Sequence, residues 1–113
     1  MEELKDKRCV PCEGGTPALD DISVRKLLGE VKGWDRRVEV GRPERIAKRF
    51  TFDDFLGAMA FVDKMAALAE EQGHHPDFCV HYSQVDVTLW THAVGGLSTN
   101  DFILASKIDA ILT

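Results

Sequence analysis

Hydrophobic and polar residues recur along this chain with two different periods, and the period changes at turn-forming residues. Between about residues 20 and 32 the apolar positions have helical spacing, with Asp20 as a candidate N-cap and Gly33 as the end. Residues 34–40 and 46–52 alternate with a period of two, and the turn sequence 41–44 separates them. The pattern predicts a helix followed by a β-hairpin. The expected buried stripe of the helix comprises Leu19, Ile22, Leu27, Leu28 and Val31.

The strongest helical pattern covers about residues 53–72. Thr51 is the candidate cap, acidic residues occupy the first turn, and Gly73 has the position of a C-cap. The predicted central stripe is Phe55, Met59, Val62, Ala66 and Ala69, with further apolar residues on both sides. Burial in the core is the simpler interpretation. The width of the arc and its many alanines also leave room for a partner helix.

A second hairpin is predicted from residues 78–82 and 85–92, with its turn at Ser83 and Gln84. In the second strand one face carries Val85, Val87, Leu89 and Thr91, and the other carries Asp86, Thr88, Trp90 and His92. Trp90 is therefore the same-face neighbour of His92, which we expect at the end of the strand. After Gly95 and Gly96, a last helix capped by Ser98 or Thr99 should run to Leu112, with Asp101 in its first turn.

The order of these elements is helix, hairpin, helix, hairpin, helix. It predicts an α+β fold: a four-stranded antiparallel sheet with three helices packed on one face. We expect one domain over residues 19–113, preceded by an irregular arm over residues 1–18, which is charged and then rich in glycine and proline. Trp34 directly follows the first helix, and the usual burial of tryptophan makes it a predicted core anchor.

Charge and composition exclude some classes of function. The 113 residues have a formal net charge of −5, so no basic field attracts nucleic acid or anionic lipid. No apolar stretch approaches the roughly 20 residues that span a bilayer, and no signal peptide opens the chain. We therefore expect a cytoplasmic protein without nucleic-acid or membrane partners.

The cysteines are Cys9, Cys12 and Cys79, an odd number that argues against a disulfide framework. Cys9 and Cys12 have the spacing of redox or zinc motifs. A single pair without a second ligand pair, and without the strand and helix of a redox motif, is a weak signal. An inert N-terminal arm is the favoured interpretation, with metal or redox chemistry as the alternative.

The candidate chemistry lies in the histidines. His74 and His75 follow the predicted helix end and precede Pro76, which forces a bend; His92 follows after one hairpin. A general acid–base site is the first interpretation, because imidazole exchanges protons near neutral pH. A three-histidine zinc site is the second, although adjacent side chains diverge, and an exposed turn is the third. His81 stands alone in a strand and is predicted to be a surface residue.

Together these residues resemble the pterin-4a-carbinolamine dehydratase family. The resemblance rests on Glu70-x-x-x-His74-His75-Pro76, then Thr91-His92, Gly96-Leu97-Ser98 and Asp101. It extends to Gly33-Trp34, Phe50-x-Phe52 with Phe55, and Ala105-Ser106-Lys107-Ile108, and covers about residues 19–112. The opening sequence from Cys9 to Gly15 is similar to that of bacterial members. Phe78 and Trp90 depart mildly from the family pattern and bear on substrate fit.

The resemblance implies a hydro-lyase that removes water from a 4a-hydroxytetrahydropterin, as 4a-hydroxytetrahydrobiopterin dehydratase does, and gives a quinonoid dihydropterin. It implies catalytic roles for His74, His75 and His92. The substrate-binding residues implied are Gly73, Pro76, Trp90, Thr91, Ala93 and Asp101. Asp101 either orients an imidazole or is only a helix-start carboxylate. The electrons come from a ring nitrogen of the pterin, so no cofactor and no metal are expected.

The resemblance also implies a homo-oligomer, either a dimer or a tetramer. The alternative function is a non-enzymatic dimerisation or assembly cofactor with the same fold, because some relatives have such roles. A pure scaffold does not need three histidines and Asp101, all of which this chain retains. A metal-dependent enzyme that uses the histidines with Cys9 or Cys12 is the third possibility.

Overall fold

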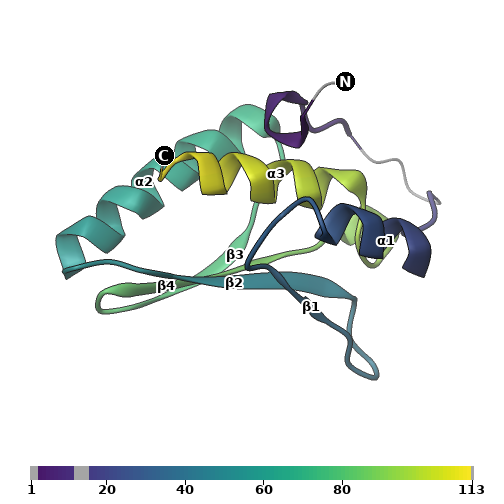
Figure 1. Cartoon of the computed structure of the whole chain (residues 1–113), viewed down its shortest axis with the longest axis horizontal. Helices are drawn as coiled ribbons and strands as arrows, with labels where there is room; N and C mark the ends of the chain where they lie inside the picture. The colour runs from purple at the N-terminus through teal and green to yellow at the C-terminus, as the bar shows by residue number, and fades with distance from the viewer. Residues whose placement is uncertain (1–2, 12–15, 113) are drawn as a thin grey trace.

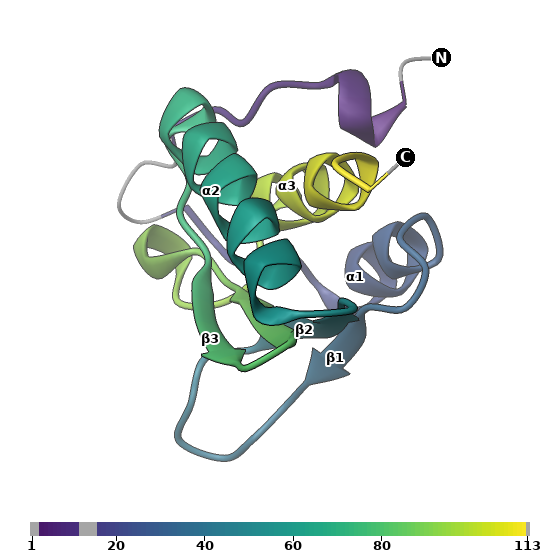
Figure 2. The same ribbon diagram turned by 90° about the vertical axis from the view of Figure 1, so that its left-hand side faces the viewer.

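The predicted α+β fold is confirmed: three helices cover one face of a four-stranded antiparallel sheet (Figures 1 and 2). The computed structural model describes residues 3–11 and 16–112. Its elements are η1 (Leu4–Asp6), α1 (Asp21–Leu28), β1 (Asp35–Arg37), β2 (Arg45–Thr51), α2 (Phe55–Gln72), β3 (Asp77–His81), β4 (Gln84–Leu89), η2 (His92–Val94) and α3 (Thr99–Ala110), where η marks a 3-10 helix. The strand order is β1-β2-β4-β3.

The hydrophobic core lies between the sheet and the helices. The helix-facing side chains of β4 are Val85, Val87 and Leu89, and all three are fully buried, as the alternation predicts. They pack in one cluster with residues of the other elements: Val24, Ile46, Phe50, Phe61, Met65, Phe102, Leu104 and Ile108. Trp34 is buried too, which confirms it as a core residue, and its indole Nε1 donates to Asp109 Oδ2 at 3.0 Å.

The first helix and the first hairpin are shorter than predicted. α1 starts after the predicted cap, because the Asp20 side chain accepts a hydrogen bond from the Ser23 amide, but it ends at Leu28 instead of residue 32. Ile22, predicted to be buried, is exposed, and Val24 occupies the buried position instead. β1 ends at Arg37 because only residues 35–37 have partners on β2, so that residues 38–40 leave the sheet.

α2 begins later than predicted. Thr51 is the last residue of β2, and the N-cap is Asp54, whose carboxylate accepts from the Gly57 amide. The buried stripe is shifted toward one flank of the predicted stripe: Val62 and Ala69 are buried as predicted, together with Ala58, Phe61, Met65 and Gln72. Phe55 and Ala66 of the predicted stripe are exposed. The reason is that a helix this rich in apolar residues has no single clear periodicity, so the sequence pattern does not fix which face meets the sheet.

The C-terminal end of α2 and the start of α3 form as the sequence predicts. Gly73 closes α2 with a φ of 66°, the left-handed conformation that favours glycine. Ser98 caps α3 in a capping box, in which the side chains of Ser98 and Asp101 each bond the other residue's backbone amide. α3 ends at Ala110, two residues before the predicted end.

β4 is also shorter than predicted, and His92 is not a strand residue. The strand ends at Leu89, and Thr91 pairs once with Gly96 in an isolated bridge. The chain between them forms η2, and Gly95, with a φ of 66°, closes it. The bridge pins both ends of this short segment, so His92 lies on a turn at the end of the sheet.

None of the helices among residues 3–11 and 16–112 is both long enough and apolar enough to cross a membrane.

Candidate functional site

A hollow of about 410 Å³ lies where the C-terminal end of α2, the start of β3, the segment after β4 and the start of α3 meet. Elements far apart in the sequence therefore meet at one end of the sheet (Figure 1). The hollow is lined by Val10, Pro11, Gly73, His74, His75, Pro76, Asp77, Trp90, Thr91, His92, Ala93 and Asn100. It is large enough for a small heteroaromatic ligand.

The His74 side chain is hydrogen-bonded to a buried carboxylate. Its Nε2 lies 2.6 Å from Oδ1 of Asp101, which is fully buried. The other oxygen, Oδ2, accepts from Thr91 Oγ1 at 2.8 Å and from the Ser98 amide at 2.9 Å. With the carboxylate as acceptor, His74 Nε2 carries a hydrogen, and Nδ1 is the ring nitrogen left for another partner. The imidazole is therefore held in one orientation by a buried, fully bonded carboxylate.

His75 points to different surroundings. Its Nε2 lies 3.0 Å from Glu70 Oε1, and both side chains are largely exposed. Glu70 lies in the last turn of α2, so the bend at Gly73 brings the imidazole back beside its own helix. The adjacent histidines thus diverge, as expected of successive side chains, while both line the hollow.

His92 is fixed by an aromatic neighbour. Its ring stacks on the indole of Trp90, with centroids 3.7 Å apart and an interplanar angle of 27°. The indole Nε1 in turn donates to Asp77 Oδ2 at 3.2 Å. Trp90 and His92 were predicted as neighbours on one strand face, and they do lie side by side, although on the turn after β4.

The structure brings nearly all of the predicted site residues together. Every one of them lines the hollow except Asp101, which lies behind His74 and cannot reach solvent. Of its two predicted roles Asp101 has both: it contacts an imidazole and it completes the capping box.

Sequence reasoning missed Val10, Pro11, Asp77 and Asn100, which also line the hollow. For Asp77 a signal was present, because a carboxylate directly follows the His74-His75-Pro76 bend. For Val10 and Pro11 no local pattern reports a contact with residues about 60 to 90 positions away.

The alternative of a metal site at the histidines and cysteines lacks a set of ligands in the described residues. Within residues 3–11 and 16–112, no group of three His, Cys, Asp or Glu side chains has a geometry that could hold a metal ion. Cys12 lies outside the described residues, so the Cys9-Cys12 motif is not described as a pair. His81 is exposed, as predicted, with its Nε2 3.3 Å from Asp86 Oδ2.

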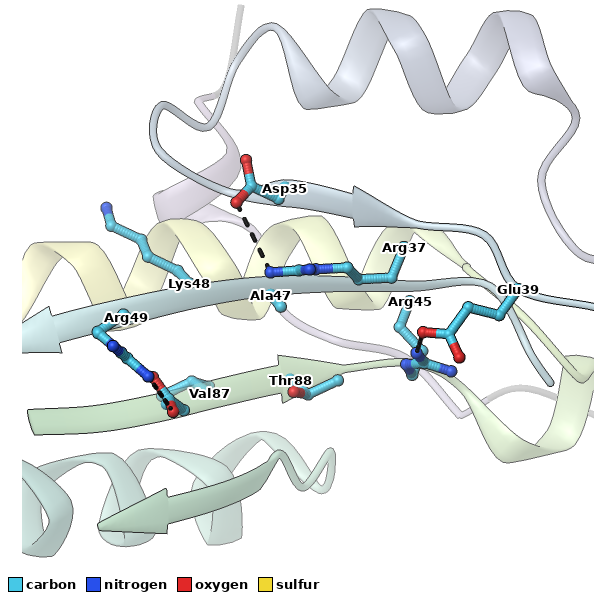
Figure 3. Close-up of a pocket in the computed structure, with 10 residues that line it drawn as sticks. Asp35, Arg37, Glu39, Arg45, Ala47, Lys48, Arg49, Val87 and Thr88 are labelled. Carbon is cyan, nitrogen blue, oxygen red and sulfur yellow. Dashed lines mark hydrogen bonds and ion pairs between the residues drawn. The ribbon is translucent and has the colours of Figure 1, made fainter. Parts of the chain in front are cut away.

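A second hollow, of about 360 Å³, lies over β1, β2 and β4 and has different chemistry (Figure 3). Most of its charged side chains pair with one another, such as Arg45 with Glu39 at 2.7 Å and Arg49 with Asp86 at 2.6 Å. The hydrogen bond from Arg49 holds the pKa of Asp86 below its ordinary value. No histidine lines this hollow, in contrast to the hollow at the end of α2, which His74, His75 and His92 line.

Comparison with known proteins identifies the family of this chain. The family model for pterin 4 alpha carbinolamine dehydratase matches residues 17–111. The chain belongs to this family.

A protein of Rubrobacter xylanophilus named "Putative pterin-4-alpha-carbinolamine dehydratase" is 39% identical over 98% of this chain and 100% of its own length. A Rickettsia bellii protein of the same name is 42% identical over 96% of this chain and 93% of its own.

Two solved structures have a similar fold. A transcriptional coactivator/pterin dehydratase from Brucella melitensis is 34% identical, with a TM-score of 0.77 over 85% of this chain and 99% of that one. A pterin dehydratase-like protein identified as a RuBisCO assembly factor in the alpha-carboxysome is 30% identical, with a TM-score of 0.59 over 70% of this chain and 88% of that one.

Proposed function

We propose that the protein is a dehydratase that converts a 4a-hydroxytetrahydropterin to a quinonoid dihydropterin, with histidines as general acid and base. The observation that carries the proposal is the meeting of His74, His75 and His92 in one hollow. Family membership supports the substrate class, because relatives at 39% and 42% identity carry the name of a pterin-4-alpha-carbinolamine dehydratase.

The reaction needs two proton transfers and no external electrons. The C4a–O bond breaks as the lone pair of the adjacent ring nitrogen forms a C=N bond. A general acid protonates the departing hydroxyl, which leaves as water, and a general base takes a proton from a ring N–H. Imidazole serves both roles near neutral pH. Protons balance, since one is delivered to oxygen and one is removed from nitrogen.

The surroundings of the three histidines suit different tasks. His75 and His92 are exposed at the rim of the hollow, so they exchange protons with substrate and with water, and we assign the transfers to them. His74 is mostly buried and its Nε2 is occupied by Asp101, so it binds the substrate through its remaining nitrogen or relays a proton there. Asp101 acts through His74 as a positioning residue, and Trp90 covers one face of His92.

The direct test is catalysis with a freshly generated 4a-hydroxytetrahydropterin. Decay of its ultraviolet absorbance is followed with and without the purified protein. We expect catalytic amounts of protein to accelerate the decay well beyond the spontaneous rate. Decay at the spontaneous rate, with protein that is folded by circular dichroism, would contradict the proposal.

The second candidate function is that of an assembly cofactor without catalysis. It is favoured by the similarity to a protein whose title describes a RuBisCO assembly factor, although that match covers only 70% of this chain. The same decay assay separates the two functions. A scaffold leaves the spontaneous rate unchanged and is equally active in its partner's assembly when His75 is replaced by alanine.

A further inference from the structure

The N-terminal arm reaches the histidine hollow. Val10 and Pro11 line it, although they lie before residue 17, where the family model begins to match. Val10 is 63% exposed, so an apolar side chain stands uncovered beside the hollow. The arm therefore supplies part of the site's wall from outside the region that defines the family.

Two buried amide side chains hold this part of the arm in place. Gln72 Oε1 accepts from the Cys9 amide at 2.9 Å. Asn100 bonds Val10 twice: its Oδ1 accepts from the Val10 amide at 2.9 Å, and its Nδ2 donates to the Val10 carbonyl oxygen. Both side chains are less than a tenth exposed. A buried amide left without partners costs about 1–3 kcal/mol, so these bonds favour the docked arm.

The two amide residues that hold the arm, Gln72 and Asn100, lie close in sequence to the bonded pair His74 and Asp101. Gln72 directly precedes Gly73 and His74, and Asn100 directly precedes Asp101. The arm thus bridges the end of α2 and the start of α3, the same two segments that the His74–Asp101 bond joins.

A further contact fixes the arm earlier in the chain. Leu4 of η1 is buried in the core, and Lys107 of α3 donates to the Lys5 carbonyl oxygen at 2.8 Å. Figure 1 shows η1 beside α3, with the arm continuing from it toward the N-terminal end of α3. Residues 9–11 are therefore held in place between η1, earlier in the arm, and the hollow.

We propose that residues 9–11 form a binding wall of the pterin site, that Val10 contacts the bound ring, and that Asn100 is the positioning residue for this wall. The inference rests on the proposed function for its ligand. A flat heteroaromatic ring in the hollow covers the exposed Val10 side chain, and apolar contact of this kind is the usual wall of a small-molecule site.

The test is a pterin titration of Val10→Asp against Val40→Asp. Both substitutions place a carboxylate on an exposed valine, but Val40 is fully exposed in the loop between β1 and β2 and does not line the hollow. A stable 7,8-dihydropterin is the probe, and calorimetry measures its Kd. We expect Val10→Asp to raise Kd by roughly tenfold or more, a change of 1.4 kcal/mol, and Val40→Asp to leave it unchanged. Equal Kd values for the wild type and Val10→Asp would overturn the proposal.

A double-mutant cycle tests the role of Asn100. Asn100→Ala removes both bonds to Val10 and should raise the KM for substrate several-fold, with kcat within about twofold, because the wall contributes to binding alone. Since Asn100 acts through Val10, the effects of Asn100→Ala and Val10→Asp on Kd should be less than additive. Strict additivity, or a loss of kcat without a change in KM, would refute the positioning role.

The results of these titrations distinguish a failure of the binding-wall proposal from a failure of the proposed dehydratase function. If the wild-type protein binds dihydropterin without accelerating dehydration, the dehydratase proposal is contradicted. The comparison of Val10→Asp with the wild type still tests whether residues 9–11 form a binding wall. An active protein whose Val10→Asp variant binds dihydropterin as tightly as the wild type contradicts the wall alone. Amide hydrogen exchange gives a second measurement: pterin should slow exchange at Val10 in the wild type and much less in Asn100→Ala.

Discussion

Two adjacent histidines in this site have opposite surroundings. His74 bonds a fully buried carboxylate, while His75 bonds an exposed one. The difference follows from the bend at Gly73, after which successive side chains point apart. A histidine with a fixed ring and one with access to water suit positioning and proton exchange respectively. Residue identity alone predicts neither role, because the role comes from the carboxylate that each ring meets.

Replacing Asp101 by asparagine tests the positioning of His74. Asparagine keeps one acceptor oxygen and replaces the other by an NH2 donor, so it cannot accept both from the His74 Nε2–H and from Thr91 and Ser98. We expect kcat to fall roughly tenfold, less than the 10²–10⁴-fold typical of losing a general acid or base.

The matched control for that variant is Asp109→Asn on the same helix. Asp109 bonds Trp34 and Lys48 away from the hollow. It should lower the Tm and leave kcat unchanged. A kcat loss of the same size in both variants would show that Asp101 acts only through stability.

The two tryptophans should separate binding from stability. Trp90 lines the hollow and stacks on His92, so Trp90→Ala should chiefly raise the Kd for pterin. Trp34 is buried in the core, so Trp34→Ala should chiefly lower the free energy of unfolding, by about 3–5 kcal/mol. Pterin titration and thermal melts measure both. The assignment fails if Trp90→Ala binds pterin normally while folded Trp34→Ala does not bind it.

At the scale of elements, the residues of the site lie at the ends of helices and strands rather than in their middle turns or residues. The side chains of the His74 network are His74 itself, directly after the C-cap of α2, Thr91 in the turn after β4, and Asp101 in the capping box of α3. Turn chemistry at Gly73, Gly95 and Ser98 is readable from sequence, so this part of the site was predictable.

The exact start of α2 and the contacts between distant residues were less predictable. Thr51 and Asp54 are both good caps, and only the length of β2 decides between them. The pairing of Asp77 with Trp90, and of Asn100 with Val10, joins residues 13 and 90 positions apart. Such contacts are set by tertiary packing and leave no periodic signal in the sequence.

The uncovered side of α2 predicts self-association. Leu56 is 77% exposed and Phe55 is 47% exposed on a helix whose other side is buried. We expect light scattering to give the mass of a dimer or tetramer, and Leu56→Asp to shift the protein toward the monomer. Ile22→Asp on α1, an equally exposed position, is the control and should leave the mass unchanged. A monomeric mass for the wild type at micromolar concentration would contradict the prediction.

At the scale of the whole molecule, the fold separates its arginine–carboxylate pairs from the hollow that the histidines line. The face of the sheet shown in Figure 3 carries arginines that pair with neighbouring carboxylates, whereas His74, His75 and His92 line the hollow at the C-terminal end of α2. The proposed ligand site is lined by imidazoles, the Asp77 carboxylate and a few neutral polar groups. This arrangement suits proton transfer to a neutral ring better than binding of a highly charged ligand.

The reaction's own electron balance predicts independence from metal. Because the ring nitrogen supplies the electrons, turnover should be unchanged after dialysis against a chelator. Metal analysis of the purified protein accompanies the assay. Activity that disappears on chelation and returns with zinc would favour the three-histidine metal site instead.

The central claim is that His75 and His92 transfer the protons of dehydration, and steady-state kinetics of their alanine variants test it most directly. His81→Ala is the control, since His81 is exposed and lies outside the hollow. We predict a fall in kcat of roughly 10²–10⁴-fold for His75→Ala and for His92→Ala, with unchanged melting temperatures, and no change for His81→Ala. Wild-type kcat in both His75→Ala and His92→Ala would contradict the account.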